Sequence, residues 1–243
     1  MTKIRRFGGW LLCAATLASG ILYAQNRSET GSSAELHLRI VSSLPGKHRA
    51  VPAAIWLEPL AGTPTLPFPP HGHYTLLQKS RMFIPHLLVI PAGSAVGFPN
   101  EDPFFHNVFS LYEGKRFNLG LYEAGSSKSV TFSRVGVSYI FCNIHPEMSA
   151  VVIALNTPLY ATADTEDSFL LNSIPPGDYK LHVWIEGVPQ SFLDSLSRPI
   201  HFASHPVDLG LIKAPIAGAK TVPHTTMYGT EYTPNSQSTY PSH

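Results

Sequence analysis

The sequence contains little cysteine and little charge. Only 2 of its 243 residues are cysteine, and 14% are Asp, Glu, Lys or Arg. So few thiols exclude an iron–sulfur cluster, which needs several. With a formal net charge of only +1, the chain lacks the basic stripe that a phosphate backbone requires, so we expect no nucleic-acid partner. The 44% of apolar residues suit a globular protein with a buried core.

The first 24 residues read as a secretory signal. Lys3, Arg5 and Arg6 form a basic start, residues 10–23 are an apolar run, and Ala24 is a small residue suited to cleavage. We expect cleavage after Ala24 on the general secretory route; an uncleaved anchor is the alternative. The prediction is a periplasmic or extracellular protein with no stable membrane span after cleavage.

Removal of this segment changes the chemistry of the mature chain. It takes away three positive charges and no negative ones, so the formal charge becomes 1 − 3 = −2. It also removes Cys13, which leaves Cys142 as the single cysteine in a compartment where thiols pair or oxidise. Either this thiol is buried and inert, or something other than a second sulfur holds it.

The rest of the chain is typical of an all-β protein, because no convincing amphipathic helix pattern is present. Short β-rich runs are separated by Pro, Gly and Asn turn signals, a spacing that favours a β-sandwich. We divide the chain into a signal peptide (1–24), N-terminal strands with a Pro/Gly-rich linker (25–73), a central β domain (74–155), a second, smaller β unit (156–213) and a disordered tail (214–243).

One segment carries metal-ligand chemistry. Cys142, His145 and Met148 follow one another at intervals of three residues, and His106 stands upstream at the start of a predicted strand. A thiolate, two imidazoles and a weak axial thioether are the donor set that suits one copper ion. A β-sandwich brings a residue at the edge of a strand close to a loop at the same end, so the long separation of His106 from Cys142 in sequence is no obstacle.

Other interpretations of these residues are weaker. A lone His or Met is more often a surface or core residue than a ligand, but here four donors of three types occur together. Structural zinc favours paired Cys and His clusters, and a dinuclear copper site needs a second cysteine in the loop. Glu147, like Glu101 and Asp102 before His106, reads as a solvated loop charge; the alternative is that a carboxylate replaces Met148 and gives a red copper site.

Five segments of the central domain match a known pattern: Val96 to Asn100, His106 to Val108, Tyr122 to Gly125, Gly136 to Tyr139 and Cys142 to Met148. Through them the domain resembles the cupredoxins, and within them the amicyanin and plastocyanin groups. The resemblance covers about residues 74–155 and implies a Greek-key β-sandwich with copper near one end. It also implies that His106, Cys142 and His145 are equatorial ligands, that Met148 is the axial ligand and that the Asn107 amide donates to the thiolate.

One departure from the pattern concerns the residue before the second histidine. Those two groups carry proline there, whereas this chain has Ile144. A non-proline residue keeps its amide hydrogen, which can then point at the Cys142 sulfur.

The outer segments resemble a different fold. Asp167 to Phe169, Ile174 to Tyr179 and Leu181 to Trp184 look like the second half of a carboxypeptidase-regulatory or transthyretin-like β-sandwich, with residues 35–57 as its first half. The copper domain would then be inserted into that sandwich.

The expected function is electron transfer by an exported type-one (blue) copper protein with a redox partner protein that the sequence does not identify. Copper handling, as storage or delivery, is the alternative. We expect no enzyme, because a type-one centre has no open position for substrate and no nucleophile constellation stands out.

Overall fold

The structure is a computed structural model that describes residues 33–43, 51–68, 72–111, 114–164, 166–216 and 224–232. The predicted signal peptide, residues 1–24, lies outside them. No helix among the described residues is long and apolar enough to cross a membrane.

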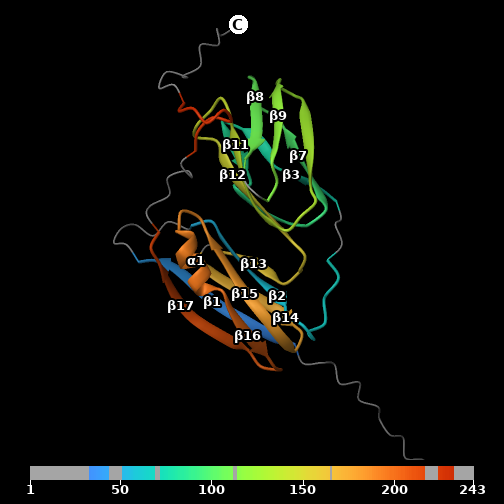
Figure 1. Ribbon diagram of the computed structural model, residues 1–243, viewed down its shortest axis with the longest axis vertical. Helices are drawn as coiled ribbons and strands as arrows, with labels where there is room; N and C mark the ends of the chain where they lie inside the picture. Colours follow the sequence, from blue (N-terminus) through green and yellow to red (C-terminus); the bar gives the residue numbers. More distant parts are fainter. Residues whose placement is uncertain are drawn as a thin grey trace, which may run out of the picture. The chain divides into compact units, whose positions relative to one another are not determined.

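Residues 73–155 form two main sheets and a small hairpin (Figure 1). The first sheet has the strand order β6-β12-β11-β8-β9, the second has the order β10-β7-β3, and β4 pairs with β5. The strands are β3 (His73–Thr75), β4 (Leu77–Lys79), β5 (Met82–Ile84), β6 (Leu87–Pro91), β7 (Ser94–Pro99), β8 (His106–Ser110), β9 (Phe117–Tyr122), β10 (Ser127–Phe132), β11 (Gly136–Cys142) and β12 (Ser149–Leu155).

Alternating side chains build the core between these sheets. In β7, Val96 and Phe98 are buried while their neighbours are partly exposed, which is the period of two expected of a strand with one buried face. They share an apolar cluster with Ile140 of β11 and Val152 of β12. β12 is buried at all seven positions, because it lies between β6 and β11 and both of its faces are covered.

Strands from either side of this region in the sequence pair with one another. One sheet has the order β14-β1-β17 and another has the order β13-β2-β15-β16. The bounds are β1 (Ala34–Ser42), β2 (Ala53–Pro59), β13 (Tyr160–Thr162), β14 (Ser168–Ile174), β15 (Gly177–Ile185), β16 (Arg198–Phe202) and β17 (Val207–Ala214). The predicted all-β class is therefore confirmed, with a β-sandwich and additional sheets.

Two expectations need correction. A short helix, α1 (Gln190–Leu196), is present; at seven residues, with only Leu193 buried, it is too short to show an amphipathic period. The tail was expected to be disordered from residue 214, but Ala214 ends β17 and is buried, as is Ile216. Residues 224–232 are also placed, against the candidate metal site. The other tail residues lie outside the described part of the chain.

Candidate metal centre

Two of the predicted ligands come from neighbouring strands. His106 is the first residue of β8 and Cys142 is the last residue of β11. The strands run antiparallel, and Cys142 pairs with Val108, two positions from His106. The pairing therefore brings two side chains that are 36 positions apart in sequence to the same end of the sheet.

The third and fourth predicted ligands lie in the connection between β11 and β12. The Cys142 amide donates to the Met148 carbonyl at 3.2 Å, and the Met148 amide donates to the His145 carbonyl at 3.0 Å. These bonds fold the connection into a tight loop that turns His145 towards Cys142. Met148 is fully buried in the same apolar cluster as Cys142.

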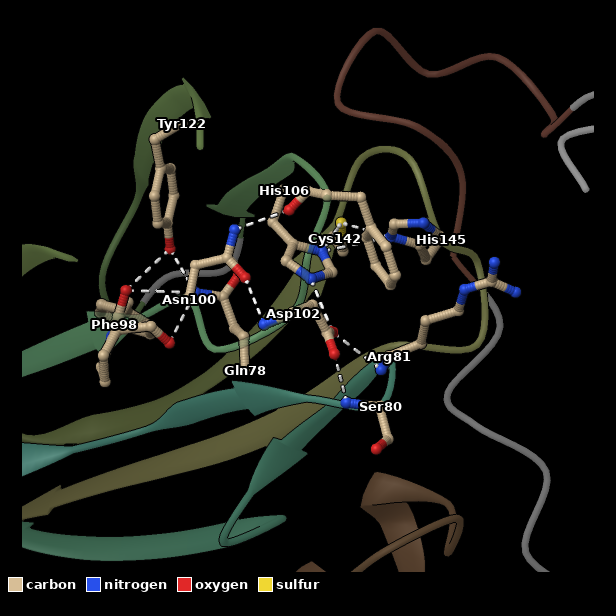
Figure 2. Close-up of polar contacts among 12 residues, drawn as sticks. Gln78, Ser80, Arg81, Phe98, Asn100, Asp102, His106, Tyr122, Cys142 and His145 are labelled. Carbon is tan, nitrogen blue, oxygen red and sulfur yellow. Dashed lines mark hydrogen bonds and ion pairs between the residues drawn. The ribbon is translucent and has the colours of Figure 1, made fainter. Parts of the chain in front are cut away.

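Three donor atoms converge where this loop meets the start of β8 (Figure 2). Cys142 Sγ lies 3.6 Å from the Nδ1 atoms of both His106 and His145, and the two Nδ1 atoms lie 3.2 Å apart. Ligand atoms at about 2.0–2.3 Å from a shared ion in a tetrahedral arrangement lie about 3.3–3.6 Å from one another. The spacing of the three atoms therefore fits one first-row metal ion.

A buried carboxylate determines which nitrogen of His106 faces this centre. Asp102 Oδ2 lies 3.0 Å from His106 Nε2, and Asp102 is only 5% exposed. A carboxylate only accepts hydrogen bonds, so Nε2 must carry the hydrogen and Nδ1 presents its lone pair to the site. Asp102 therefore fixes the His106 ring with Nδ1 towards Cys142 and His145.

Asp102 is itself held by a tight hairpin turn. The amides of Ser80 and Arg81, between β4 and β5, donate to its two oxygens at 2.6 and 3.0 Å. Burial raises the pKa of Asp102, but these amide bonds and the bond from His106 outweigh burial and hold the pKa below its ordinary value. The carboxylate is therefore ionised at neutral pH.

The turn carries strain that serves this contact. Ser80 and Arg81 both have positive φ angles, 55° and 57°, in the left-handed region that side chains disfavour. Two-residue hairpin turns of this hand match strand twist, but Asn and Gly are their usual residues. The conformation aims two successive amide hydrogens at one anion, as in the anion-binding concavities that successive backbone N–H groups form.

Two buried amides support the segment that carries Asp102. Asn100 Nδ2 donates to the Phe104 carbonyl at 2.8 Å, and Asn100 Oδ1 accepts the Asp102 amide at 3.0 Å. Gln78, also fully buried, donates to the Phe98 carbonyl at 3.1 Å and to the Tyr122 hydroxyl. The Asn100 bonds close the turn before β8, and Gln78 joins β4 to β7 and β9 while its main-chain carbonyl accepts the Glu101 amide of the turn at 2.9 Å (Figure 2).

The sulfur lies in a shell of backbone amides. Burial raises the pKa of the Cys142 thiol, while the amides of Asn107, Ile144 and His145 donate to the sulfur and oppose the rise. The amide of Asn107 has the role expected of it, and Ile144 uses the hydrogen that proline would lack. Without a metal, Cys142 is a thiol at neutral pH, and these amides already hold its sulfur where it could bond a metal ion as a thiolate.

Both imidazoles are neutral at pH 7. Burial lowers the pKa of His106 against the effect of Asp102, and burial together with the nearby His106 lowers the pKa of His145. The Phe104 ring lies against both, with centroids 5.3 Å from each imidazole. Neutral imidazoles in an aromatic shell are competent metal ligands and need not lose a proton to bind.

Of the three carboxylates expected to be solvated near the site, two are exposed and one is buried. Glu101 and Glu147 are exposed, as predicted, and Glu101 pairs with Lys79 at 3.0 Å. For Asp102 the prediction of a solvated charge is wrong, because the turn at Ser80, 22 positions away, buries it. The sequence feature that could have marked Asp102 as a partner of His106 is its position four residues earlier. Among the described residues, the His106–Cys142–His145 group that can hold a metal includes no carboxylate.

Comparisons with known proteins find similarity to part of the chain. No family model matches it, and no curated protein matches it. Among solved structures, a purple cupredoxin from Nitrosopumilus maritimus is 24% identical over 35% of this chain and 100% of its own, with a TM-score of 0.31. Amicyanin from Paracoccus versutus is 21% identical over 41% of this chain and 91% of its own, with a TM-score of 0.32.

A Cu-containing nitrite reductase from Thermus scotoductus SA-01 is 26% identical, with a TM-score of 0.33; the similarity covers 40% of this chain but only 25% of the reductase. Because these TM-scores are low, we infer what the site can bind from its own side chains alone.

Proposed function

We propose that this chain is a type-one (blue) copper protein of the cupredoxin kind, that His106, Cys142, His145 and Met148 hold one copper ion, and that the protein transfers electrons. The observation that carries the proposal is the convergence of two neutral imidazoles and one thiol, all buried, at 3.2–3.6 Å from one another. Two imidazoles and a thiolate with a weak thioether favour copper over zinc or iron. When bound, copper supplies one-electron redox chemistry.

The chain's own residues supply the rest of what electron transfer requires. Asp102 fixes the orientation of His106, and three amides fix the sulfur of Cys142, so the donors are set in place by the fold. Burial of His106 and His145 keeps solvent away from the donor atoms. A site that is already in position changes little between oxidation states, which favours fast electron exchange over substrate binding. For this reason we propose a carrier and not an enzyme, with a redox partner protein.

The test is the absorption spectrum of the protein lacking residues 1–24 and loaded with cupric ion. We expect an intense orange-red band that Cys142→Ser abolishes. Met148→Leu should shift the band, whereas Met82→Leu, at a methionine that is 53% exposed on β5, should not. A colourless protein that takes up zinc as readily as copper would refute the proposal.

A second experiment separates electron transfer from copper storage or delivery. Repeated voltammetric cycles in the presence of a cuprous chelator should leave the copper in place if the protein is a carrier of electrons. Loss of copper at each reduction would instead support the handling function. In a red, carboxylate-ligated site Glu147 would replace Met148 as the ligand, and Glu147→Gln would then change the spectrum. Because we propose Met148 as the ligand, we expect Glu147→Gln to leave the spectrum unchanged.

Export and domain organisation complete the proposal. The basic start, the apolar run and the small residue Ala24 support an exported protein whose mature chain begins at Gln25. N-terminal sequencing of the protein from a periplasmic fraction tests this. We further propose that residues 74–155 are the copper domain and that the flanking strands form the transthyretin-like unit. The pairing of β1 with β14 and β17 supports this division.

A further inference from the structure

A C-terminal segment lies against the loop that carries the candidate ligands. Residues 224–232 follow β17 in the chain but contact three consecutive residues at the end of β11. The Tyr232 hydroxyl donates to the Cys142 carbonyl at 2.8 Å, and the Met227 amide donates to Asn143 Oδ1 at 2.9 Å. The His224 ring stacks on Phe141 with centroids 3.9 Å apart and an interplanar angle of 18°.

The segment has an internal structure that places these groups. The Thr226 amide donates to the Thr230 carbonyl at 2.8 Å, their hydroxyls lie 2.7 Å apart, and Gly229 turns the chain with a φ of +77°. The closed turn brings the rings of His224 and Tyr232 to 5.3 Å from each other at 76°. Both legs of the turn therefore face the ligand loop, while Tyr228 at its tip is 78% exposed.

The contacted backbone determines where the sulfur points. Cys142 ends β11, its amide is bonded to the Met148 carbonyl, and the next amide, that of Asn143, donates to the Asn107 carbonyl at 2.9 Å. The Tyr232 hydroxyl adds a bond to the carbonyl between these two amides. Fixing an amide, a carbonyl and the following amide leaves the peptide after Cys142 little rotational freedom, and the Cα–Cβ bond that carries the sulfur is held with it.

We propose that residues 224–232 form a clamp on the ligand loop, in which Tyr232 is a positioning residue that holds the Cys142 backbone and, through it, the direction of the thiolate. We infer the clamp from contacts within the chain; its effect on copper rests on the proposed function. A segment more than 80 residues beyond Cys142 in sequence thereby becomes part of the metal site.

The test compares two substitutions of the same kind in the same segment, in the otherwise complete mature protein. Tyr232→Phe removes only the hydroxyl that bonds Cys142, whereas Tyr228→Phe removes an exposed hydroxyl at the tip. In the metal-free protein, Tyr232→Phe should speed hydrogen exchange of the Met227 and Asn143 amides by about 2- to 10-fold, the range that loss of one hydrogen bond gives. Tyr228→Phe should leave both rates unchanged.

In the copper-loaded protein, Tyr232→Phe should raise the rate of copper removal by a chelator by a similar factor of about 2 to 10. Tyr232→Phe should also shift the thiolate–copper vibrations in the resonance Raman spectrum. Tyr228→Phe should change neither the rate of copper removal nor these vibrations. Equal exchange rates for the two variants would overturn the clamp. Altered exchange with an unchanged copper spectrum would overturn the positioning role. A protein that binds no copper but shows the exchange difference would refute the proposed function and leave the clamp in place.

Discussion

Replacing Asp102 with asparagine removes one charge and keeps the shape of the side chain. The carboxylate accepts three hydrogen bonds, from the Ser80 amide, the Arg81 amide and His106 Nε2. Asparagine has one oxygen and one NH₂ group. Whichever way its amide turns, the NH₂ group faces at least one donor, so at least one buried N–H loses its acceptor.

The size of the effect follows from this count. A buried donor left without a partner costs about 1–3 kcal/mol, and bonds to a charged acceptor are at the upper end of the usual range. We therefore expect Asp102→Asn to lower the free energy of unfolding of the metal-free protein by about 1–3 kcal/mol. The neighbouring Glu101→Gln is a matched control: its side chain is 51% exposed, and a change there should stay within about 0.5 kcal/mol.

Urea unfolding at several pH values is the assay, because the effect has a predicted pH dependence. The pKa of Asp102 is lower in the folded protein than in the unfolded chain. Its contribution is therefore complete above the pKa of an unfolded aspartate, about 4, and disappears as the pH falls through the lower, folded value. The difference between wild type and Asp102→Asn should be constant near neutrality and shrink in acid. Equal stabilities at pH 7, or a difference independent of pH, would refute the role given to Asp102.

Three further predictions concern the copper-loaded protein and its core. Ile144→Pro removes an amide that donates to the Cys142 sulfur. Because the reduced site carries more negative charge on sulfur, loss of this amide destabilises the reduced state, and the reduction potential should fall by roughly 20–60 mV in voltammetry. An unchanged or higher potential would contradict this reasoning. Because Cys142 is a thiol and both imidazoles are neutral at pH 7, cupric binding should release about one proton, measured by calorimetry in buffers of different ionisation enthalpy; release of two or more would show a protonated histidine. Gln78→Leu removes the side-chain donor to the Pro99 carbonyl and to the Tyr122 hydroxyl, while the Phe98 carbonyl keeps its bond from Tyr122. We expect it to cost about 1–3 kcal/mol of unfolding free energy, whereas Gln190→Leu on the exposed face of α1 should cost little.

The sequence predicts those parts of this molecule that depend on local pattern. The spacing of Cys142, His145 and Met148 places three donor types on one short connection, and two of them meet His106 because β8 and β11 pair. Alternation in β1 and β7 predicts strands with one buried face. These features need only neighbouring residues or one strand pairing to be recognised.

The features that the sequence did not predict depend on distant contacts. Asp102 has the same local surroundings as the exposed Glu101, and only the turn at Ser80 and Arg81 distinguishes them. Residues 224–232 have no hydrophobic period, because they dock through one ring and two hydrogen bonds. Neither kind of contact leaves a periodic signal in the sequence.

The anchoring of Asp102 by main-chain amides has a consequence for how such a site varies among relatives. The turn between β4 and β5 holds the carboxylate through two main-chain N–H groups. Substitutions at Ser80 and Arg81 would preserve the contact as long as the new residues accept a left-handed backbone, as Asn, Asp and Gly do. In an alignment of relatives, positions 80 and 81 could then vary in residue type while the turn keeps its backbone conformation. The conserved position would be the aspartate, which lies three strands further along the chain than the turn that holds it.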